Sequence, residues 1–166
     1  MRPGILLFIL LLIFNGSAQT TALRGQVSWI DDGDSLRVEG VGKVRLLGID
    51  TPEARASSRD RFYHQRFAIP PHRLRLVAAQ AKELNLHRAK NRYVHLEPGR
   101  LPRDKHGRLL AYVYLPDGTM LNRLLLKKGL ASVFRRYDFR YKAEFLATEK
   151  KARDRQIGLW QKSESL

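Results

Sequence analysis

The chain has 166 residues, with 28% charged and 43% hydrophobic residues, a composition typical of one globular domain rather than a disordered segment. Lysine and arginine number 31 against 16 acidic residues, so the formal net charge is +15. Such a basic domain is expected to bind polyanions, either nucleic acid or an anionic membrane surface. Cysteine is absent, which excludes disulfide scaffolds, zinc–thiolate sites and cysteine nucleophiles. Five histidines without paired spacing argue against a zinc hydrolase.

The N-terminal segment has the three-part pattern of a secretory signal peptide. Arg2 provides the positive start, residues 5–14 form an unbroken apolar run, and the small residues Gly16 and Ala18 precede a cleavage site. The alternative is a membrane anchor, but this run is shorter than the roughly 20 apolar residues that span a bilayer. We therefore predict cleavage of residues 1–18, export to the medium or the periplasm, and no stable membrane association afterwards.

Residues 24–49 show the period-two alternation of short strands. A turn is expected at residues 39–42, which contain two glycines. Residues 54–69 show little periodicity and are rich in arginine, which predicts an exposed basic loop. The alternating positions of the strands are Val27, Trp29, Leu36, Val38, Val44 and Leu46.

The second half of the chain alternates between helical and extended patterns. Pro70 and Pro71 open a helix with one apolar face. A second basic loop is expected at residues 98–107, followed by an aliphatic strand and a short helix that Gly129 ends. A last basic helix closes at residues 158–160. This order predicts a small antiparallel barrel with helices packed on one side.

The few acidic residues are concentrated in one region. Clustered like charges destabilise a fold unless something compensates them, and a bound divalent cation does so. Hard oxygen ligands favour calcium or magnesium over zinc. The alternative is that the cluster is a solvated turn followed by a loop or helix cap. Six of the 16 acids lie in it: Asp31, Asp32, Asp34, Glu39, Asp50 and Glu53.

Two arginines strengthen the catalytic interpretation of this cluster. Arg45 occupies an outward position in an otherwise apolar strand, and Arg108 precedes the next strand. A guanidinium can donate two hydrogen bonds to one phosphate. Metal-binding carboxylates, two arginines and a spare carboxylate are the groups that phosphodiester cleavage requires.

Three segments together resemble the staphylococcal nuclease (thermonuclease) family: DGDS at residues 32–35, VRLLGIDTPE at 44–53 and DKHGR at 104–108. DGD alone is common in turns, whereas the three segments in this order are not expected by chance. The resemblance predicts a nuclease domain over residues 24–161, with 162–166 as a C-terminal tail. Shorter matches continue through residues 110–114, 122–125, 129–131 and 158–160.

The resemblance implies a fold and a cofactor. The fold is α+β and mainly β, a five-stranded antiparallel OB-fold barrel with about three packed helices, which agrees with the alternation of the strands. Asp34 and Asp50 resemble the carboxylate ligands of one Ca²⁺ ion. The main-chain oxygen of Thr51 resembles its third protein ligand.

The resemblance also assigns catalytic roles. Glu53 resembles the general base that activates the attacking water, and Arg45 and Arg108 resemble the arginines that bind the phosphate in the transition state. A domain that only binds nucleic acid has no use for this combination. We therefore expect an exported, calcium-dependent endonuclease that cleaves DNA and RNA with little sequence preference, leaves 3′-phosphate ends and acts as a monomer. The alternative is an OB-fold nucleic-acid-binding protein with weak or no catalysis.

The expected substrate contacts depart in part from the family pattern. Lys105 is placed to hold a terminal phosphate, and His106 stands where the founding member of the family has tyrosine. Arg135 and Arg136 replace part of an aromatic wall, which leaves Tyr137 to stack on a base. Lys105, His106, Arg135 and Tyr137 are therefore the predicted substrate-binding residues.

Overall fold

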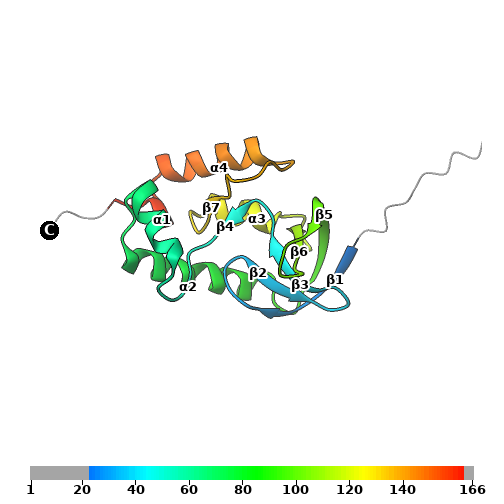
Figure 1. Ribbon diagram of the computed structural model, residues 1–166. Helices are drawn as coiled ribbons and strands as arrows, with labels where there is room; N and C mark the ends of the chain where they lie inside the picture. Colours follow the sequence, from blue (N-terminus) through cyan, green and yellow to red (C-terminus); the bar gives the residue numbers. More distant parts are fainter. Residues whose placement is uncertain (1–22, 163–166) are drawn as a thin grey trace, which may run out of the picture.

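Five strands form a closed barrel at one end of the molecule (Figure 1). The computed structural model describes residues 23–162, so the predicted signal peptide and residues 163–166 of the predicted tail lie outside the described residues. The predicted barrel is confirmed. Its strands are β1 (Leu23–Ile30), β2 (Ser35–Val38), β3 (Gly42–Leu46), β5 (Tyr93–Arg103) and β6 (Leu109–Tyr114), in the order β1-β2-β3-β6-β5.

The barrel is mixed rather than purely antiparallel. Neighbouring strands are antiparallel except at the junction of β3 and β6, where Val44 pairs with Leu109 in a parallel register. The expectation of an antiparallel barrel is therefore wrong at this junction. A closed ring with an odd number of strands cannot alternate direction throughout, so at least one neighbouring pair must be parallel.

Four α-helices pack outside the barrel, where about three were expected. They are α1 (Ser58–Phe67), α2 (Pro71–Arg88), α3 (Leu121–Lys127) and α4 (Lys142–Asp154), followed by a 3-10 helix at Gly158–Trp160. In Figure 1, α1 lies toward the end of the molecule away from the barrel strands, and α2 runs from there toward the barrel, where it contacts β1. Within residues 23–162, no helix combines the length and apolarity needed to cross a bilayer.

The additional helix, α1, lies inside the segment predicted to be a basic loop. Its start is capped by Ser57, whose Oγ accepts a hydrogen bond from the Arg59 amide at 3.2 Å. Its side chain Tyr63 is fully buried. The segment has few other apolar residues besides Tyr63 and several arginines. Its sequence therefore shows no clear helical spacing of apolar positions. The second predicted loop is also largely strand, because β5 continues to Arg103.

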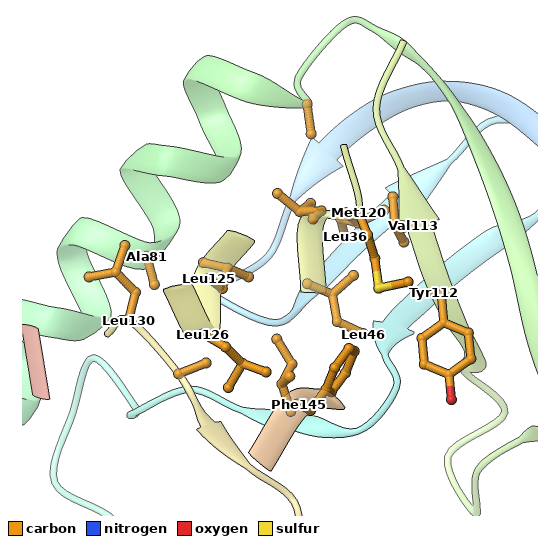
Figure 2. Packing of buried hydrophobic residues seen from close by; sticks show 14 of the residues in the cluster. Leu36, Leu46, Ala81, Tyr112, Val113, Met120, Leu125, Leu126, Leu130 and Phe145 are labelled. Carbon is orange, nitrogen blue, oxygen red and sulfur yellow. The ribbon is translucent and has the colours of Figure 1, made fainter. Parts of the chain in front are cut away.

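The core joins the barrel interior to the helices. Five of the six predicted alternating positions are buried, including Leu36 of β2 and Leu46 of β3. The exception is Trp29 of β1, which is 55% exposed, because the register of β1 with β2 shifts between Val27 and Trp29. Figure 2 shows these side chains together with Leu125 of α3 and Phe145 of α4. Apolar burial stabilises by roughly 25 cal/mol per Å², so this shared core holds the helices against the barrel.

A two-stranded sheet connects the barrel with the helical end. It consists of β4 (Ile49–Asp50) and β7 (Ser132–Val133), with Asp50 paired to Ser132. The Phe134 amide extends the pairing by donating to the Gly48 carbonyl at 2.9 Å. The sheet holds Asp50 beside the barrel, although the residue lies beyond the end of β3.

The end of α3 contacts the C-terminal 3-10 helix through two glycines. Gly129 has φ +67° and Gly158 has φ +59°, and the Leu159 amide donates to the Gly129 carbonyl at 2.8 Å. A Cβ at Gly129 would collide with the main-chain carbonyl of Ile157. Glycine is therefore required here both for its backbone conformation and for the close approach.

We expect Gly129→Ala to lower the free energy of unfolding by more than about 2 kcal/mol, because backbone strain and a clash with main-chain atoms add. Gly118→Ala is the matched control, since Gly118 has φ +78° but open space around its missing Cβ. The control should lose only about 1 kcal/mol. Urea unfolding measures the free energy of unfolding of both variants. Equal losses would contradict the close approach of Gly129 to the Ile157 carbonyl.

Candidate active site

Two buried carboxylates lie next to each other at the edge of the barrel. Asp34 immediately precedes β2, Asp50 ends β4, and they are only 3% and 6% exposed. The Asp34 carbonyl accepts from the Leu46 amide at 2.8 Å, which fixes the start of β2 against the end of β3. The Asp34 carboxylate accepts from the Thr51 amide at 3.0 Å, so Thr51 lies beside both carboxylates.

Arg45 of β3 bridges the two carboxylates. Its Nη1 donates to Asp34 at 2.5 Å, and its Nη2 donates to Asp50 at 3.2 Å. Burial alone would lower the pKa of Arg45, but the charges of Asp34 and Asp50 outweigh this effect and raise it. A guanidinium with opposite charges on two sides is held in one orientation, which gives it a fixed geometry for binding a phosphate.

Helix α1 provides further contacts to Asp50. Arg59 donates from Nη2 to the carboxylate at 2.5 Å, and the Tyr63 hydroxyl donates to it at 3.0 Å. Burial first, and then the nearby Asp50 charge, raise the pKa of Tyr63 well above its ordinary value. Sequence reasoning missed Arg59 and Tyr63. The available signal was Ser57 followed by Asp60, a helix-start pattern inside the arginine-rich segment.

Arg108 reaches the cluster through a serine. Its Nε donates to Asp104 at 2.8 Å and its Nη1 to the Ser35 Oγ at 3.3 Å, while that Oγ donates to Asp34 at 3.0 Å. Burial works to raise the pKa of Asp104, but hydrogen bonds from His106 and Arg108 outweigh it and lower the pKa. The two predicted phosphate-binding arginines are thus joined through Ser35 and Asp34.

Two further acids border the buried pair. The Asp32 carboxylate accepts from the Asp34 amide at 2.9 Å, and burial together with the Asp34 charge raises the pKa of Asp32 from 3.8 to about 6. Glu53 is exposed in the loop after β4, yet its charge acts on both Asp32 and Arg45. Of Asp32, Asp34, Asp50 and Glu53, only Glu53 is exposed to solvent. The Asp32–Gly33 turn is held by Asn85 of α2, whose amide donates to both carbonyls.

The predicted substrate-binding residues are in three different settings. Lys105 and His106 are exposed in the turn before Arg108, and the His106 amide donates to Asp104 at 2.9 Å. Tyr137 is 60% exposed, and its ring lies 5.8 Å from that of Phe134. These side chains are open to solvent on loops.

Arg135 is directed into the protein instead. Its Nη1 donates to the Val133 carbonyl at 2.9 Å and to the carboxylate of Glu149 at 3.2 Å, while its Nη2 forms an ion pair with the same carboxylate. Glu149 on α4 is almost fully buried. The structure therefore does not bring Arg135 together with the carboxylate cluster, and its guanidinium compensates a buried charge.

The side chains fit a hard divalent cation. The ligands that the resemblance implies, the carboxylates of Asp34 and Asp50 and the main-chain oxygen of Thr51, are all oxygen donors of the kind that calcium prefers. Burial first, and then the charge of Asp34, raise the pKa of Asp50 even though Arg59 and Arg45 act in the opposite direction. Among residues 23–162, no cluster of three or more histidine or acidic side chains could hold a metal. A cation here would therefore depend on a main-chain oxygen and on water or substrate.

A comparison with family models matches residues 43–162 to the staphylococcal nuclease homologue model. This range contains Arg45, Asp50, Glu53 and Arg108 and makes up most of the chain. The chain belongs to the staphylococcal nuclease family. Asp34 lies N-terminal to the matched range, and the structure brings it to the other members of the site through Arg45 and Thr51.

Individual relatives of this family member match along most of its length. The thermonuclease of Staphylococcus intermedius is 31% identical over 150 residues, which cover 86% of this chain and 81% of the relative. Endonuclease YncB of Bacillus subtilis is 33% identical over 138 residues, covering 80% of this chain and 59% of the relative. The uncharacterized protein MJ1439 of Methanocaldococcus jannaschii is 34% identical over 147 residues, which cover 82% of this chain and 70% of the relative.

The raised pKa of Asp32 predicts a pH-dependent stability in the metal-free protein. A carboxyl whose folded pKa is about 6 rather than 3.8 holds its proton more tightly when folded, so its ionisation destabilises the fold above about pH 6. We expect Asp32→Asn to raise stability at pH 7.5 by about 1–2 kcal/mol, after allowance for solvent screening. The gain should disappear as the pH falls through 6 toward 4.

Thermal unfolding in a chelator at pH 7.5 and pH 4 measures this effect. Asp138→Asn is the control, since the Asp138 side chain is 94% exposed, and it should change the melting temperature little at either pH. A loss of stability for Asp32→Asn that is the same at both pH values would show that the carboxylate is not under electrostatic strain.

Proposed function

We propose that this family member is a calcium-dependent endonuclease that hydrolyses DNA and RNA with little sequence preference and leaves 3′-phosphate ends. We also propose that the mature chain is exported after cleavage of residues 1–18 and acts as a monomer. The observation that carries the enzymatic proposal is the placement of Arg45 between Asp34 and Asp50, with Arg108 connected to the same carboxylates through Ser35. The thermonuclease and endonuclease names of the relatives support it.

The arrangement divides the work of phosphodiester hydrolysis among a few side chains. Arg45 and Arg108 donate to the non-bridging oxygens and offset the charge that develops as the phosphorus becomes five-coordinate. Glu53, which is exposed, accepts a proton from the attacking water as the new phosphorus–oxygen bond forms. The bond to the 5′ oxygen then breaks, and that oxygen takes a proton from water. A calcium ion held by Asp34, Asp50 and the Thr51 carbonyl would supply further positive charge beside the phosphate.

Nucleic-acid binding without catalysis is the competing function. A surface that only binds phosphates gains from arginines but not from adjacent carboxylates, which repel the backbone of the ligand. In this chain the carboxylates of Asp34 and Asp50 are buried next to Arg45 and occupy two of its donor groups. This arrangement weakens simple phosphate binding, and it favours an enzyme whose carboxylates hold a cation.

We expect calcium to support cleavage of long DNA by the purified chain and a chelator to abolish it. The proposed donor set of two carboxylates and one carbonyl leaves several positions for water and a phosphate oxygen, which suits the flexible coordination of calcium. Magnesium prefers strict octahedral geometry and keeps its waters, so it should support little cleavage even if it binds. Initial rates on a fluorescent DNA substrate measure this, and full activity in magnesium after calcium is chelated would contradict the calcium assignment.

The two catalytic roles predict separate losses of rate at saturating calcium. Glu53→Gln keeps the shape of the side chain but removes the base, which should lower the cleavage rate by about 10²–10⁴-fold. Arg108→Lys keeps the charge but loses the fixed donors at the phosphate, and the expected loss is about 10²–10³-fold. Arg123→Lys is the control, because Arg123 forms an exposed ion pair with Glu144.

All three variants should keep melting temperatures close to that of the parent protein, since none of these side chains lies in the barrel core. Near-parental rates for both folded active-site variants would overturn the proposed mechanism. A loss of rate in the control of the same size would show that the assay reports general damage rather than the roles of Glu53 and Arg108.

A further inference from the structure

The outer face of the barrel continues from the candidate active site onto neighbouring strands. Alternation along β3 puts Lys43 on the same face as Arg45, and alternation along β2 puts Arg37 on the same face as Ser35. Arg37 pairs with Lys43 across the two strands, and Trp29 of β1 pairs with Arg37 on its other side. A stripe of Lys43, Arg37 and Trp29, called the outer stripe below, therefore crosses β3, β2 and β1 beside Arg45.

Trp29 is the aromatic end of the outer stripe. It is 55% exposed, whereas the second tryptophan, Trp160, is 9% exposed. Lys90 lies in the connection between α2 and β5, and its ammonium is 5.5 Å from the centre of the Trp29 ring. An exposed indole flanked by cations offers a flat surface for stacking with charge nearby, as in proteins that bind single-stranded nucleic acid.

The two cationic side chains of the outer stripe differ in exposure and in their ion pairs. Arg37 is about half exposed and donates from Nε and Nη2 to the carboxylate of Asp31 at 3.1–3.3 Å. This pairing reduces the net charge of the stripe but holds the guanidinium in place between Trp29 and Lys43. Lys43 is exposed. A phosphate can therefore approach Lys43 directly and share the remaining donors of Arg37.

The spacing of the outer stripe suits a nucleotide chain. Neighbouring strands lie about 4.8 Å apart, so Trp29 and Lys43 are separated by roughly 10 Å across β2. Lys43 and Arg45 are two residues apart on one strand, a distance of roughly 7 Å. That separation is close to the distance between successive phosphates of an extended single strand. A base on Trp29 would thus lie about two or three nucleotides from a phosphate at Arg45.

We propose that the outer stripe is a binding track for single-stranded DNA or RNA, in which Lys43 and Arg37 contact phosphates and Trp29 stacks on a base away from the cleaved bond. This inference rests on the proposed function, since it extends the substrate beyond the phosphate at Arg45. The track makes the enzyme bind a strand of several nucleotides without reading its sequence, because every base presents a flat aromatic face.

Intrinsic fluorescence tests the track directly. In a chelator, which keeps the strand intact, a 16-nucleotide oligothymidine should quench the fluorescence of the exposed Trp29, and a dinucleotide should quench it much less. Variants at Trp29 lack this fluorophore, so their affinity is measured by the fluorescence anisotropy of a dye-labelled 16-mer. Trp29→Ala should weaken binding of the 16-mer by about 5- to 100-fold, the range for loss of one stacked base, and Trp29→Phe should restore part of it. Lys43→Gln should weaken binding and lower the dependence of log K on log salt by about one.

Leu76→Ala is the matched control, because Leu76 is also 55% exposed but lies on α2. It should leave the affinity for the 16-mer unchanged, and melting temperatures show whether each variant is folded. A folded Trp29→Ala variant that binds the 16-mer as tightly as the parent protein would overturn the track. Recovery no better with phenylalanine than with alanine would also count against stacking.

The same samples separate this inference from the proposed function. Cleavage of long DNA in calcium tests the proposed function alone. Quenching by the 16-mer without any cleavage would leave the track as the surface of a nucleic-acid-binding protein and reject the nuclease. Cleavage without quenching, and without an effect of Trp29→Ala on affinity, would keep the nuclease and reject the track.

Discussion

The ion pairs of Arg45 with Asp34 and Asp50 are the interaction on which the rest of the site depends. Two carboxylates that are almost fully buried repel each other, and removing either charge from water is costly unless a cation is within hydrogen-bonding distance. The guanidinium satisfies both and fixes the relative positions of β2, β3 and β4. A divalent cation at the same carboxylates would free donor groups of Arg45 for a phosphate, so the pairing would hold the site together until metal and substrate arrive.

Helix α1 shows how the positive charge of the chain contributes to this arrangement. Arg59 and Tyr63 both donate to Asp50 from one face of the helix. Elsewhere, Arg135 compensates the buried Glu149. Some arginines thus neutralise internal carboxylates, and others, such as those on the outer face of the barrel, remain exposed to solvent. The positive charge available on any one binding surface is therefore smaller than the net charge of +15 suggests. The net charge still produces a field that attracts polyanions.

Some parts of this description could be predicted from the sequence because they depend on short-range patterns. Alternation located the inward positions of the barrel strands, and these are buried except at Trp29, where a register shift in β1 breaks the alternation. The concentration of acids in a basic chain indicated the site, and Asp34, Asp50 and Arg45 are in contact. Helix α1 was not predicted, because its buried Tyr63 has few apolar companions and the segment is otherwise basic. The burial of Arg135 against Glu149 was not predicted either, because the two residues meet only when α4 packs beside β7.

The sequence by itself determined the positions of the strands and of most helices, and it identified the family. It also indicated which acids and arginines belong to the candidate site. Each of these depends on residue type and local spacing. Only the tertiary structure decided which of those residues touch. The parallel pairing of β3 with β6 follows from closing five strands into a ring, and Arg108 reaches Asp34 only through Ser35 on another strand. Such contacts join residues far apart in the chain. They are set by how the barrel closes and how the helices pack on it, which no local pattern encodes.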